Sequence, residues 1–398
     1  MGGHPRRRAA GRPRPRRARP RRAARRTRGR THAAAADGRH RHGRLRDPGR
    51  GRSPMNPSPS TRSTTGAATR DDIVWNLAEH AVSYPAFTEH PGIRAEFVRS
   101  LHKRTRLWEP LLSLLAAEFD HRPSEASARV LSGWFTMVHL SAPIDQLVDR
   151  DPMSDHWRRL GGAGAIELVL ALKDQVFRAP LLALDPGTDP GTAHAVTRAT
   201  VELGSACLTA SIGEYLDVVG YSELRSEPPF PAQAAARVAL FYEQLVGWKS
   251  SVIYECLLRC AALTMEAPAP AVDALAAFGH HIGFAVQVLD DAGGVWGGGD
   301  DLEKEPVKVT SPLAYALTVD HPQRDELVDL LHTPAARRDV KRTREILDDI
   351  QARAFLEFLI RDRISLAVGA LTDVLPGLVA PLERWADAYF RRTSQAPR

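Results

Sequence analysis

The most constraining feature of this 398-residue sequence is an apolar stretch over residues 270–291 that ends in two adjacent acids, Asp290 and Asp291. The length and apolar character of the stretch predict a buried helix. Two carboxylates at the end of a buried helix carry a large desolvation cost unless a cation compensates them. We therefore expect these acids to help bind a metal ion, and Mg²⁺ suits them because it prefers oxygen ligands.

Stretches of helical length follow one another along most of the chain. Asp71 and Asp72 are suitable N-cap residues for a first helix. Proline and glycine separate the later stretches, and alternating β-branched residues are almost absent. The sequence therefore predicts one all-α domain of ten or more helices over residues 71–398. Further helices are expected over residues 93–119, 125–149, 162–184, 192–219, 231–265, 270–291, 311–319, 323–332, 341–371 and 374–392.

The N-terminal segment differs sharply from the rest in charge. Residues 1–54 contain 20 Arg, no Lys and two acids, a formal charge of +18, so the remainder carries −11 of the total of +7. An acidic remainder argues against a nucleic-acid-binding body. Residues 1–54 are too poor in apolar side chains to fold, and residues 55–70 have the composition of a linker, so residues 1–70 are expected to be a disordered segment. Three interpretations stay open: a disordered basic arm, a targeting segment, and a start-site error with Met55 as the true first residue, which we favour.

The cysteine pattern and the hydropathy profile indicate a cytoplasmic protein. Cys207, Cys256 and Cys260 lie in apolar helical contexts without partners at zinc-binding spacing. They are therefore interpreted as buried, reduced thiols. No apolar run is expected to be long enough for a membrane span, and the N-terminus lacks the apolar region of a secretory signal.

A second pair of acids, Asp145 and Asp149, lies near the end of another apolar stretch. Four residues apart, the two side chains share one face of a helix, where unpaired carboxylates repel each other and a divalent cation relieves the repulsion. The competing interpretation is a solvated helix end with Arg150 as the counter-charge. Two acidic clusters about 145 residues apart suit a site where two or three Mg²⁺ ions hold a diphosphate between facing helices.

The acidic clusters resemble the two aspartate-rich motifs, both DDxxD, of the trans-isoprenyl diphosphate synthase (polyprenyl synthetase) family. In the first, Asp145-Gln146-Leu147-Val148-Asp149, glutamine stands at the second position. In the second, Asp290-Asp291-Ala292-Gly293-Gly294, glycine stands where the third acid is expected. The resemblance extends over roughly residues 90–392.

Further elements match the family in order and spacing. Gly283 and Gln287 precede the second motif, whereas Asp301-Leu302 and Lys308-Val309-Thr310-Ser311-Pro312 follow it. Lys249-Ser250 resembles a Lys-Thr pair that reaches diphosphate oxygens, and Gly213-Glu214 with Asp217 resembles a Gly-Gln-x-x-Asp element. Lys103-Arg104-Thr105-Arg106 resembles a basic element that helps bind isopentenyl diphosphate in the family.

The sequence departs from the family mainly on the acceptor side. Family members usually carry two adjacent arginines and a glycine shortly after the first motif, but here the nearest pair, Arg158-Arg159, comes later and lacks the glycine. His102 stands where the glycine before the Lys-Arg element is expected. These groups hold isopentenyl diphosphate in the family. The residues expected to ionise the allylic diphosphate therefore match the family better than the residues expected to hold the acceptor. Gln146 is expected to lower the affinity for Mg²⁺.

The resemblance implies an all-α isoprenoid synthase fold around a central cavity for diphosphate and Mg²⁺, and a homodimer. The candidate catalytic residues are Lys249, Lys308, Asp145 and Asp290. The candidate substrate-binding residues are Lys103, Arg104, Arg106, Arg158, Arg159, Gln287 and Thr310. The candidate metal ligands are Asp145, Asp149, Asp290 and Asp291.

The implied function is that of a Mg²⁺-dependent prenyltransferase that ionises an allylic prenyl diphosphate, with isopentenyl diphosphate as one candidate acceptor. The resulting carbocation needs an apolar pocket, which Trp134, Phe135 and Phe284 could line; an ordinary core role is the alternative. Two other functions remain open: a terpene cyclase on the same fold, and a non-catalytic subunit of a prenyl synthase, which Gln146 and Gly294 motivate. The product chain length does not follow from the sequence.

Overall fold

The computed structural model describes residues 77–82, 89–122, 124–148, 155–225, 232–297, 301–304 and 307–395. The chain divides into two units, Met1–Thr65 and Gly66–Arg398, and all described residues belong to the second. The interpretations of residues 1–70, including Met55 as the first residue, and the predicted caps Asp71 and Asp72 therefore lie outside the described residues.

The described elements are all helical and include no strand, which confirms the all-α prediction. The α-helices are α1 (Leu77–Ala81), α3 (Pro91–Glu118), α4 (Glu125–Val148), α5 (Asp155–Leu181), α6 (Pro190–Arg225), α7 (Ala232–Val246), α8 (Val252–Thr264), α9 (Ala269–Trp296), α10 (Ser311–Thr318), α11 (Arg324–His332), α12 (Val340–Asp349), α13 (Ala352–Gly369) and α14 (Pro376–Gln395). A π-helical turn, η2 (Gly247–Ser251), and two 3₁₀ turns, η3 (Asp301–Glu303) and η4 (Ala335–Arg337), complete the described elements.

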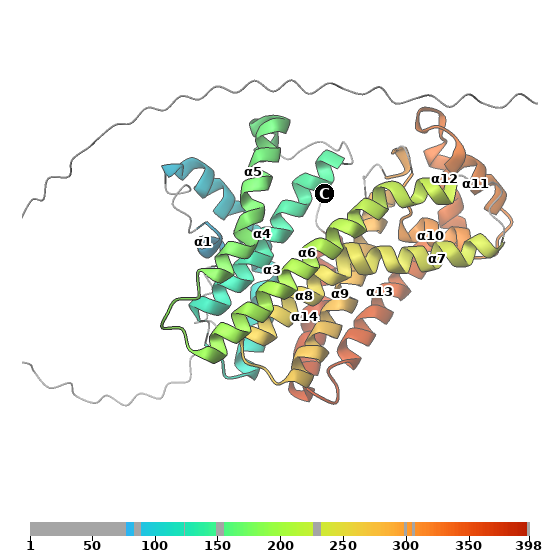
Figure 1. Ribbon diagram of the computed structural model, residues 1–398. Coiled ribbons are helices and arrows are strands. Elements are labelled where there is room, and N and C mark those ends of the chain that lie inside the picture. Colours follow the sequence, from blue (N-terminus) through green and yellow to red (C-terminus); the bar gives the residue numbers. More distant parts are fainter. Residues whose placement is uncertain are drawn as a thin grey trace, which may run out of the picture. The chain divides into compact units, whose positions relative to one another are not determined.

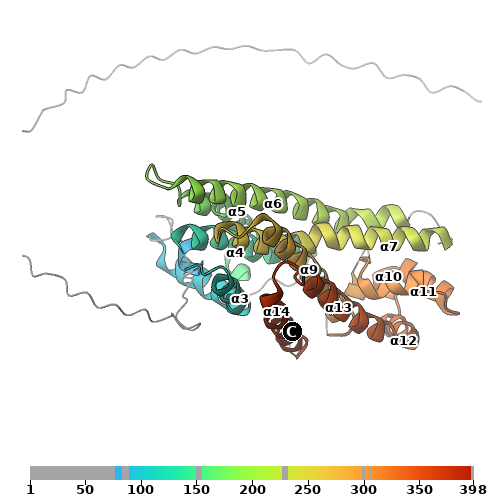
Figure 2. The same ribbon diagram turned by 90° about the horizontal axis from the view of Figure 1, so that it is seen from below.

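The pair α8 and α9 occupies the middle of the helical unit. Helix α6 packs along α8, and α13 packs along α9, so that these four helices run side by side (Figure 1). Helices α4 and α5 form a further pair that contacts α6 and α8. In Figure 2, α6 lies at the outer edge of the unit, with α7 continuing along the same side.

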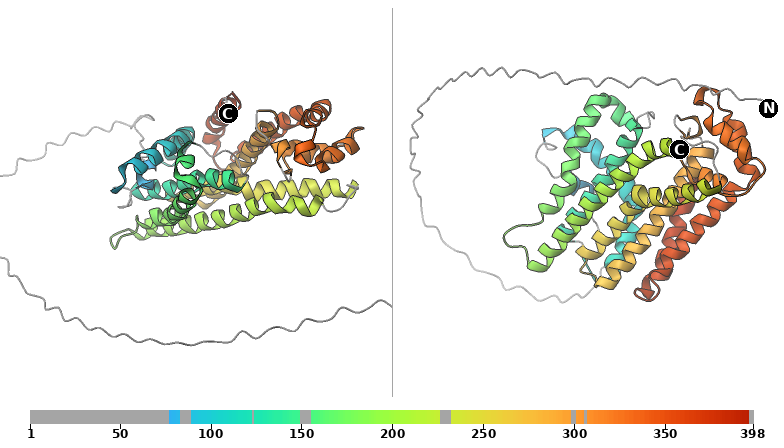
Figure 3. Two further views of the ribbon diagram at one scale, coloured as in Figure 1. Left: turned by 90° about the horizontal axis from the view of Figure 1, so that it is seen from above. Right: turned by 45° about the vertical axis from the view of Figure 1, so that its right-hand side comes forward.

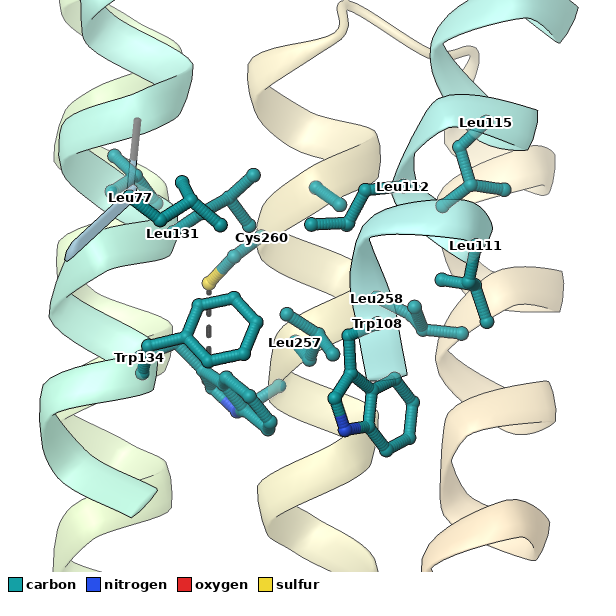
Figure 4. Close-up of a cluster of buried hydrophobic side chains, with 14 of the residues drawn as sticks. Leu77, Trp108, Leu111, Leu112, Leu115, Leu131, Trp134, Leu257, Leu258 and Cys260 are labelled. Carbon is teal, nitrogen blue, oxygen red and sulfur yellow. Dashed lines mark hydrogen bonds between the residues drawn. The ribbon is translucent and has the colours of Figure 1, made fainter. Parts of the chain in front are cut away.

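The larger of two hydrophobic cores joins α3, α4, α8, α9 and α14. The Trp108 and Trp134 rings meet edge to face with their centroids 6.1 Å apart. The Trp134 indole N–H donates to the Ile253 carbonyl at 2.6 Å, so this buried aromatic keeps a polar partner. Figure 4 shows the leucines that surround this pair: Leu111, Leu112 and Leu115 from α3, Leu131 from α4, and Leu257 and Leu258 from α8.

The second core joins α7, the end of α9 and the helices α10 to α13. Val288, Leu302 and Leu313 are among its fully buried members. Figure 3 shows α10, α11 and α12 gathered at one end of the unit. Leu302 and Val309 belong to this core, so the described parts of the segment between α9 and α10 are anchored to it.

Two predicted helices are interrupted in the structure. The stretch over residues 231–265 divides into α7, the turn η2 and α8, because the backbone widens to a π-helical turn at Gly247–Ser251. The stretch over residues 341–371 divides into α12 and α13 at Gln351, whose φ of 60° is left-handed. The sequence predicts neither interruption. A single glycine such as Gly247 is tolerated within a helix, and the apolar pattern continues through both positions.

We expected no apolar run long enough to span a membrane, and by length and composition alone this expectation is wrong. Helix α9 has 28 residues and passes both criteria, although most of its apolar window is buried inside the protein. A helix that neighbours contact on several sides is apolar around its circumference, as a spanning helix would be. The neighbours that contact α9 include α8, α13, α10 and α14.

The three cysteines carry free thiols, as predicted. Cys256 and Cys260 are buried, whereas Cys207 is half-buried beside the Met137 sulfur. Burial raises the pKa of Cys207 to about 11, which keeps the thiol protonated and unreactive at neutral pH.

Close helix packing predicts a strong dependence on Gly279. A Cβ at Gly279 of α9 would overlap the backbone of Tyr254 on α8, whereas a Cβ at Gly369 of α13 would meet open space. We expect Gly279→Ala to lower the free energy of unfolding by about 1–3 kcal/mol. The control, Gly369→Ala, should leave it unchanged or raise it slightly, because alanine loses less entropy than glycine in a helix. Urea denaturation of both variants tests this, and equal stability of the two would contradict the packing argument.

Candidate active site

The two candidate catalytic lysines converge on one carboxylate. The Lys249 Nζ lies 2.7 Å from the Asp217 Oδ2 and 2.9 Å from the Glu214 Oε2. The Lys308 Nζ lies 3.0 Å from the same Asp217 oxygen. The three elements involved are α6, η2 and the segment before α10, so residues about 90 positions apart in the sequence form one charged cluster, called here the lysine cluster (Glu214, Asp217, Lys249 and Lys308).

The backbone geometry that builds the lysine cluster depends on Gly213. A Cβ at this position would lie 2.5 Å from the Lys249 nitrogen and 2.7 Å from the Trp248 carbonyl carbon. The missing side chain lets α6 approach η2, and Glu214 and Asp217 then lie one and four residues further along α6, facing Lys249. The π-helical turn widens the backbone at Lys249, a distortion that often marks functional sites.

Asp217 stays ionised although it is buried. Burial raises its pKa, but the ion pairs with Lys249 and Lys308 outweigh that effect, and the net pKa lies below the usual value of an aspartate. The Glu214 Oε1 atom is buried without a hydrogen-bond partner among the described residues. The lysine cluster therefore holds two ammonium groups close together beside two carboxylates, one of which keeps an acceptor oxygen without a donor among the described residues.

The adjacent acids at the second motif have different environments. Asp290 is exposed, whereas Asp291 is buried. The Asp291 Oδ2 accepts hydrogen bonds from the Tyr242 hydroxyl and the Ser311 backbone N–H, each at 2.7 Å, and its Oδ1 accepts one from the Gln287 side chain at 2.8 Å. Asp291 thus ties α9 to α7 and α10.

The burial of Asp291 raises its pKa to about 7, even though the three donors favour the carboxylate. With both oxygens engaged by protein donors, Asp291 has an architectural role in this structure. Of the two predicted metal ligands on α9, Asp290 therefore faces solvent, whereas the oxygens of Asp291 are engaged by protein donors. The amide of Gln287, predicted to contact substrate, is directed at Asp291 instead.

The segment that leads into α10 presents Lys308 and Thr310 together. Thr310 is the N-cap residue of α10 and is buried, with 4% of its surface exposed. Its hydroxyl has no hydrogen-bond partner among the described residues. A buried hydroxyl two residues from Lys308 is suited to donate to a phosphate oxygen.

The remaining candidate residues lie on the first helices. Asp145 belongs to α4, but its side chain and the whole of Asp149 lie outside the described part of the chain. The same holds for the side chains of the predicted basic residues Lys103, Arg104 and Arg106, whose backbone belongs to α3. Arg158 and Arg159 are exposed at the start of α5, just before a kink at Gly161.

The candidate pocket aromatics are core residues. Trp134, Phe135 and Phe284 are each 1% exposed. The Arg363 guanidinium stacks 3.7 Å above the centroid of the Phe284 ring. The structure therefore supports the core role that the sequence left open. Tyr242 is a site residue that the sequence did not single out, because one tyrosine on an amphipathic helix carries no distinguishing signal.

The donor set is suited to Mg²⁺ only together with a substrate. Among the residues whose side chains the structure describes, no three His, Cys, Asp or Glu residues gather in a metal-binding group. Mg²⁺ is usually held by one or two carboxylates together with waters and phosphate oxygens. The exposed Asp290, with Asp301 close enough to influence it electrostatically, provides carboxylate oxygens of that kind.

Comparisons with known proteins agree with this geometry. A family model described as polyprenyl synthetase matches residues 193–350, which include the lysine cluster and the second aspartate-rich motif. The geranylgeranyl diphosphate synthase of Mycobacterium tuberculosis is 26% identical over 273 residues, which cover 66% of this chain and 72% of that protein.

Solved structures show the same fold. A decaprenyl diphosphate synthase from Rhodobacter capsulatus superposes with a TM-score of 0.61 at 17% identity, covering 80% of this chain and 94% of that one. A heptaprenyl diphosphate synthase from Staphylococcus aureus also gives 0.61, at 14% identity over 83% and 99% of the two chains. A polyprenyl synthetase from Streptomyces coelicolor gives 0.54 at 22% identity, over 71% and 82%. Residues 193–350 are thus similar to the polyprenyl synthetase family, and the helical part of the chain shares the fold of the solved prenyl diphosphate synthases.

Because Lys249 and Lys308 both pair with Asp217, we expect the stability of the fold to depend on pH through this carboxylate. We expect Asp217→Asn to lower the free energy of unfolding at pH 7 by about 2 kcal/mol, because two lysines lose a buried counter-charge. A carboxylate with a depressed pKa stabilises the fold above its unfolded pKa of about 4, and this stabilisation is lost as the pH falls through the folded value. The difference between the two proteins should therefore shrink on acidification below about pH 4.

The measurement is urea denaturation of both proteins between pH 7 and pH 3. Asp348→Asn is the matched control, because its ion pair with Arg353 is exposed and should contribute under about 1 kcal/mol. Equal stability of Asp217→Asn and the natural protein at pH 7 would contradict the prediction.

Proposed function

We propose that the chain is a Mg²⁺-dependent prenyltransferase that ionises an allylic prenyl diphosphate and transfers the prenyl group. The observation that carries the proposal is the lysine cluster, within a chain that is similar to the polyprenyl synthetase family over residues 193–350. Homologues and structural neighbours named as prenyl diphosphate synthases support a prenyltransferase activity. The three free thiols, two of them buried, support a cytoplasmic location as part of the same proposal.

The two ammonium groups of the lysine cluster are suited to stabilise the charge of a leaving diphosphate. Lys249 and Lys308 are held within about 3 Å of the same carboxylate, so their ammonium groups are fixed close together before substrate binds. Fixed cations stabilise charge that develops as the carbon–oxygen bond breaks, without reorganising at that moment. The buried Thr310 hydroxyl, two positions along the chain from Lys308, adds a neutral donor.

Mg²⁺, when bound, would supply the additional positive charge that draws the electron pair of that bond onto the diphosphate. Asp290 is the described residue suited to hold it, together with Asp145 and Asp149, which we retain as proposed ligands. Arg158, Arg159, Lys103, Arg104 and Arg106 remain the proposed residues for a second diphosphate, in particular isopentenyl diphosphate.

Removing one charge of the lysine cluster should impair the chemical step. We expect Lys249→Met to lower kcat/KM by about 100-fold, the usual effect of deleting a group that stabilises developing negative charge. Lys341→Met is the control, because the Lys341 side chain is 88% exposed on α12 and far from the cluster in sequence. The assay measures diphosphate released from geranyl, farnesyl and geranylgeranyl diphosphates with Mg²⁺, each with and without isopentenyl diphosphate.

The same assay separates the alternatives. Elongated products that require isopentenyl diphosphate support the proposal, whereas a cyclic hydrocarbon formed without it identifies a terpene cyclase. If the purified protein releases no diphosphate but changes the products of an active synthase, the chain is a non-catalytic subunit. Equal activity of Lys249→Met and the natural protein would show that the lysine cluster has no part in the mechanism.

An uncharged apolar face on α6 supports a homodimer. Val201, Leu208, Ile212 and Tyr215 recur at helical spacing along this face and are 63%, 65%, 42% and 64% exposed. The other exposed residues of α6 from 201 to 218 are two serines and Val218, so the stripe carries no charge. A long apolar stripe without charges is self-complementary, which suits a two-fold interface with a second copy of the chain. α6 also lies at the outer edge of the unit (Figure 2).

A charge placed on this stripe should separate the two copies. We expect the natural protein to have the mass of a dimer in solution and Leu208→Glu to shift it to the mass of a monomer, because two buried charges would face each other. Phe358→Glu on α13 is the control, since Phe358 is equally exposed at 63% but lies off the stripe. Size-exclusion chromatography with light scattering gives both masses. A monomeric natural protein would contradict the prediction.

A further inference from the structure

The glycine that breaks the second aspartate-rich motif is covered by a carboxylate from another segment. A Cβ built on Gly294 of α9 would overlap the side-chain carboxylate of Asp301, contacting its Oδ2 and Cγ atoms. The first carbon of any side chain at position 294 would thus occupy space that Asp301 now fills. The position that lacks an acid in the sequence is therefore next to an acid in space.

The turn that presents Asp301 is anchored through its backbone and through Leu302. Leu302 is fully buried in the second core with Val295 and Val307. The buried Arg338 guanidinium donates to the carbonyls of Leu302 at 2.7 Å and Lys304 at 3.1 Å. The backbone on both sides of Glu303 is therefore held by one side chain, which fixes the turn from which the Asp301 side chain reaches Gly294.

The carboxylate of Asp301 also belongs electrostatically to the candidate active site. Burial raises its pKa, the nearby Lys304 lowers it, and the negative charge of Asp290 raises it. Lys308 of the lysine cluster lowers it as well. The Asp301 Oδ1 lies 3.4 Å from the Lys304 Nζ, and its side chain remains 21% exposed. Asp301 is thus close enough to both the exposed acid of the motif and Lys308 to interact with them electrostatically.

We propose that Asp301 supplies from the turn η3 the third carboxylate that the motif lacks on α9, and that it helps hold Mg²⁺ bound with a diphosphate. This inference rests on the proposed function, because it assigns a further residue to the same site. Gly294 then has a defined purpose: it leaves room for a carboxylate that arrives from the next turn. The second motif is complete in space although it is interrupted in sequence.

Binding of inorganic diphosphate in the presence and absence of Mg²⁺, measured by isothermal titration calorimetry, tests the proposal without turnover. We expect Asp301→Asn, which preserves shape, to weaken Mg²⁺-dependent diphosphate binding by about 10- to 100-fold, as the loss of a group that supports a metal does. Binding without Mg²⁺ should not change. Glu303→Gln is the matched control, since it removes the same charge from an exposed position of the same turn.

A swap variant provides the second test. Asp301→Gly alone should bind as weakly as Asp301→Asn, whereas Asp301→Gly combined with Gly294→Asp returns the carboxylate to α9 and should restore binding to within about threefold of the natural protein, under 1 kcal/mol. Wild-type-like binding by Asp301→Asn would overturn the inference. A folded swap variant that binds no better than Asp301→Gly would overturn it as well. If the natural protein itself shows no Mg²⁺-dependent diphosphate binding, the proposed function fails, and this inference fails with it.

Discussion

The close approach of three backbones around the turn η2 is the constraint on which the site depends. Gly213 lets α6 reach the Lys249 backbone, and Gly283 lets α9 reach Ser251 and Tyr254 from the other side. Protein interiors are packed too densely to absorb an extra carbon at such contacts without a shift of the backbone. The distances that bring Lys249 to Asp217, and α9 with its acids to the same region, follow from these two contacts.

Charge in the site is distributed so that each buried ion has a partner of opposite sign or a set of donors. Asp217 is compensated by two lysines, and Asp291 by a hydroxyl, an amide and a backbone N–H. The difference explains why burial prevails at Asp291 and raises its pKa, whereas the cations prevail at Asp217 and lower it. One acid is therefore suited to hold the cationic groups of the site, and the other to hold helices together.

Much of this was predictable from local patterns. The apolar periodicity located the long helices, and the order of the motifs indicated the family and the residues Lys249, Asp290 and Lys308. The different roles of residues that are adjacent in the sequence could not be predicted. Asp290 and Asp291 are adjacent and chemically identical in the sequence, and only the packing of α7 and α10 against α9 makes one exposed and the other buried. The π-helical turn at Lys249 was missed because its residues keep a helical pattern.

The sequence by itself determined the fold class and the chemistry available to it, because helical periodicity and the spacing of acids and lysines are local properties. The tertiary structure decided which side chains meet. The lysine cluster joins residues about 90 positions apart, and no local pattern reports such a distance. Gly294 shows the limit most clearly: along the chain it is a missing acid, whereas in the folded protein it is the space that the carboxylate of Asp301 occupies.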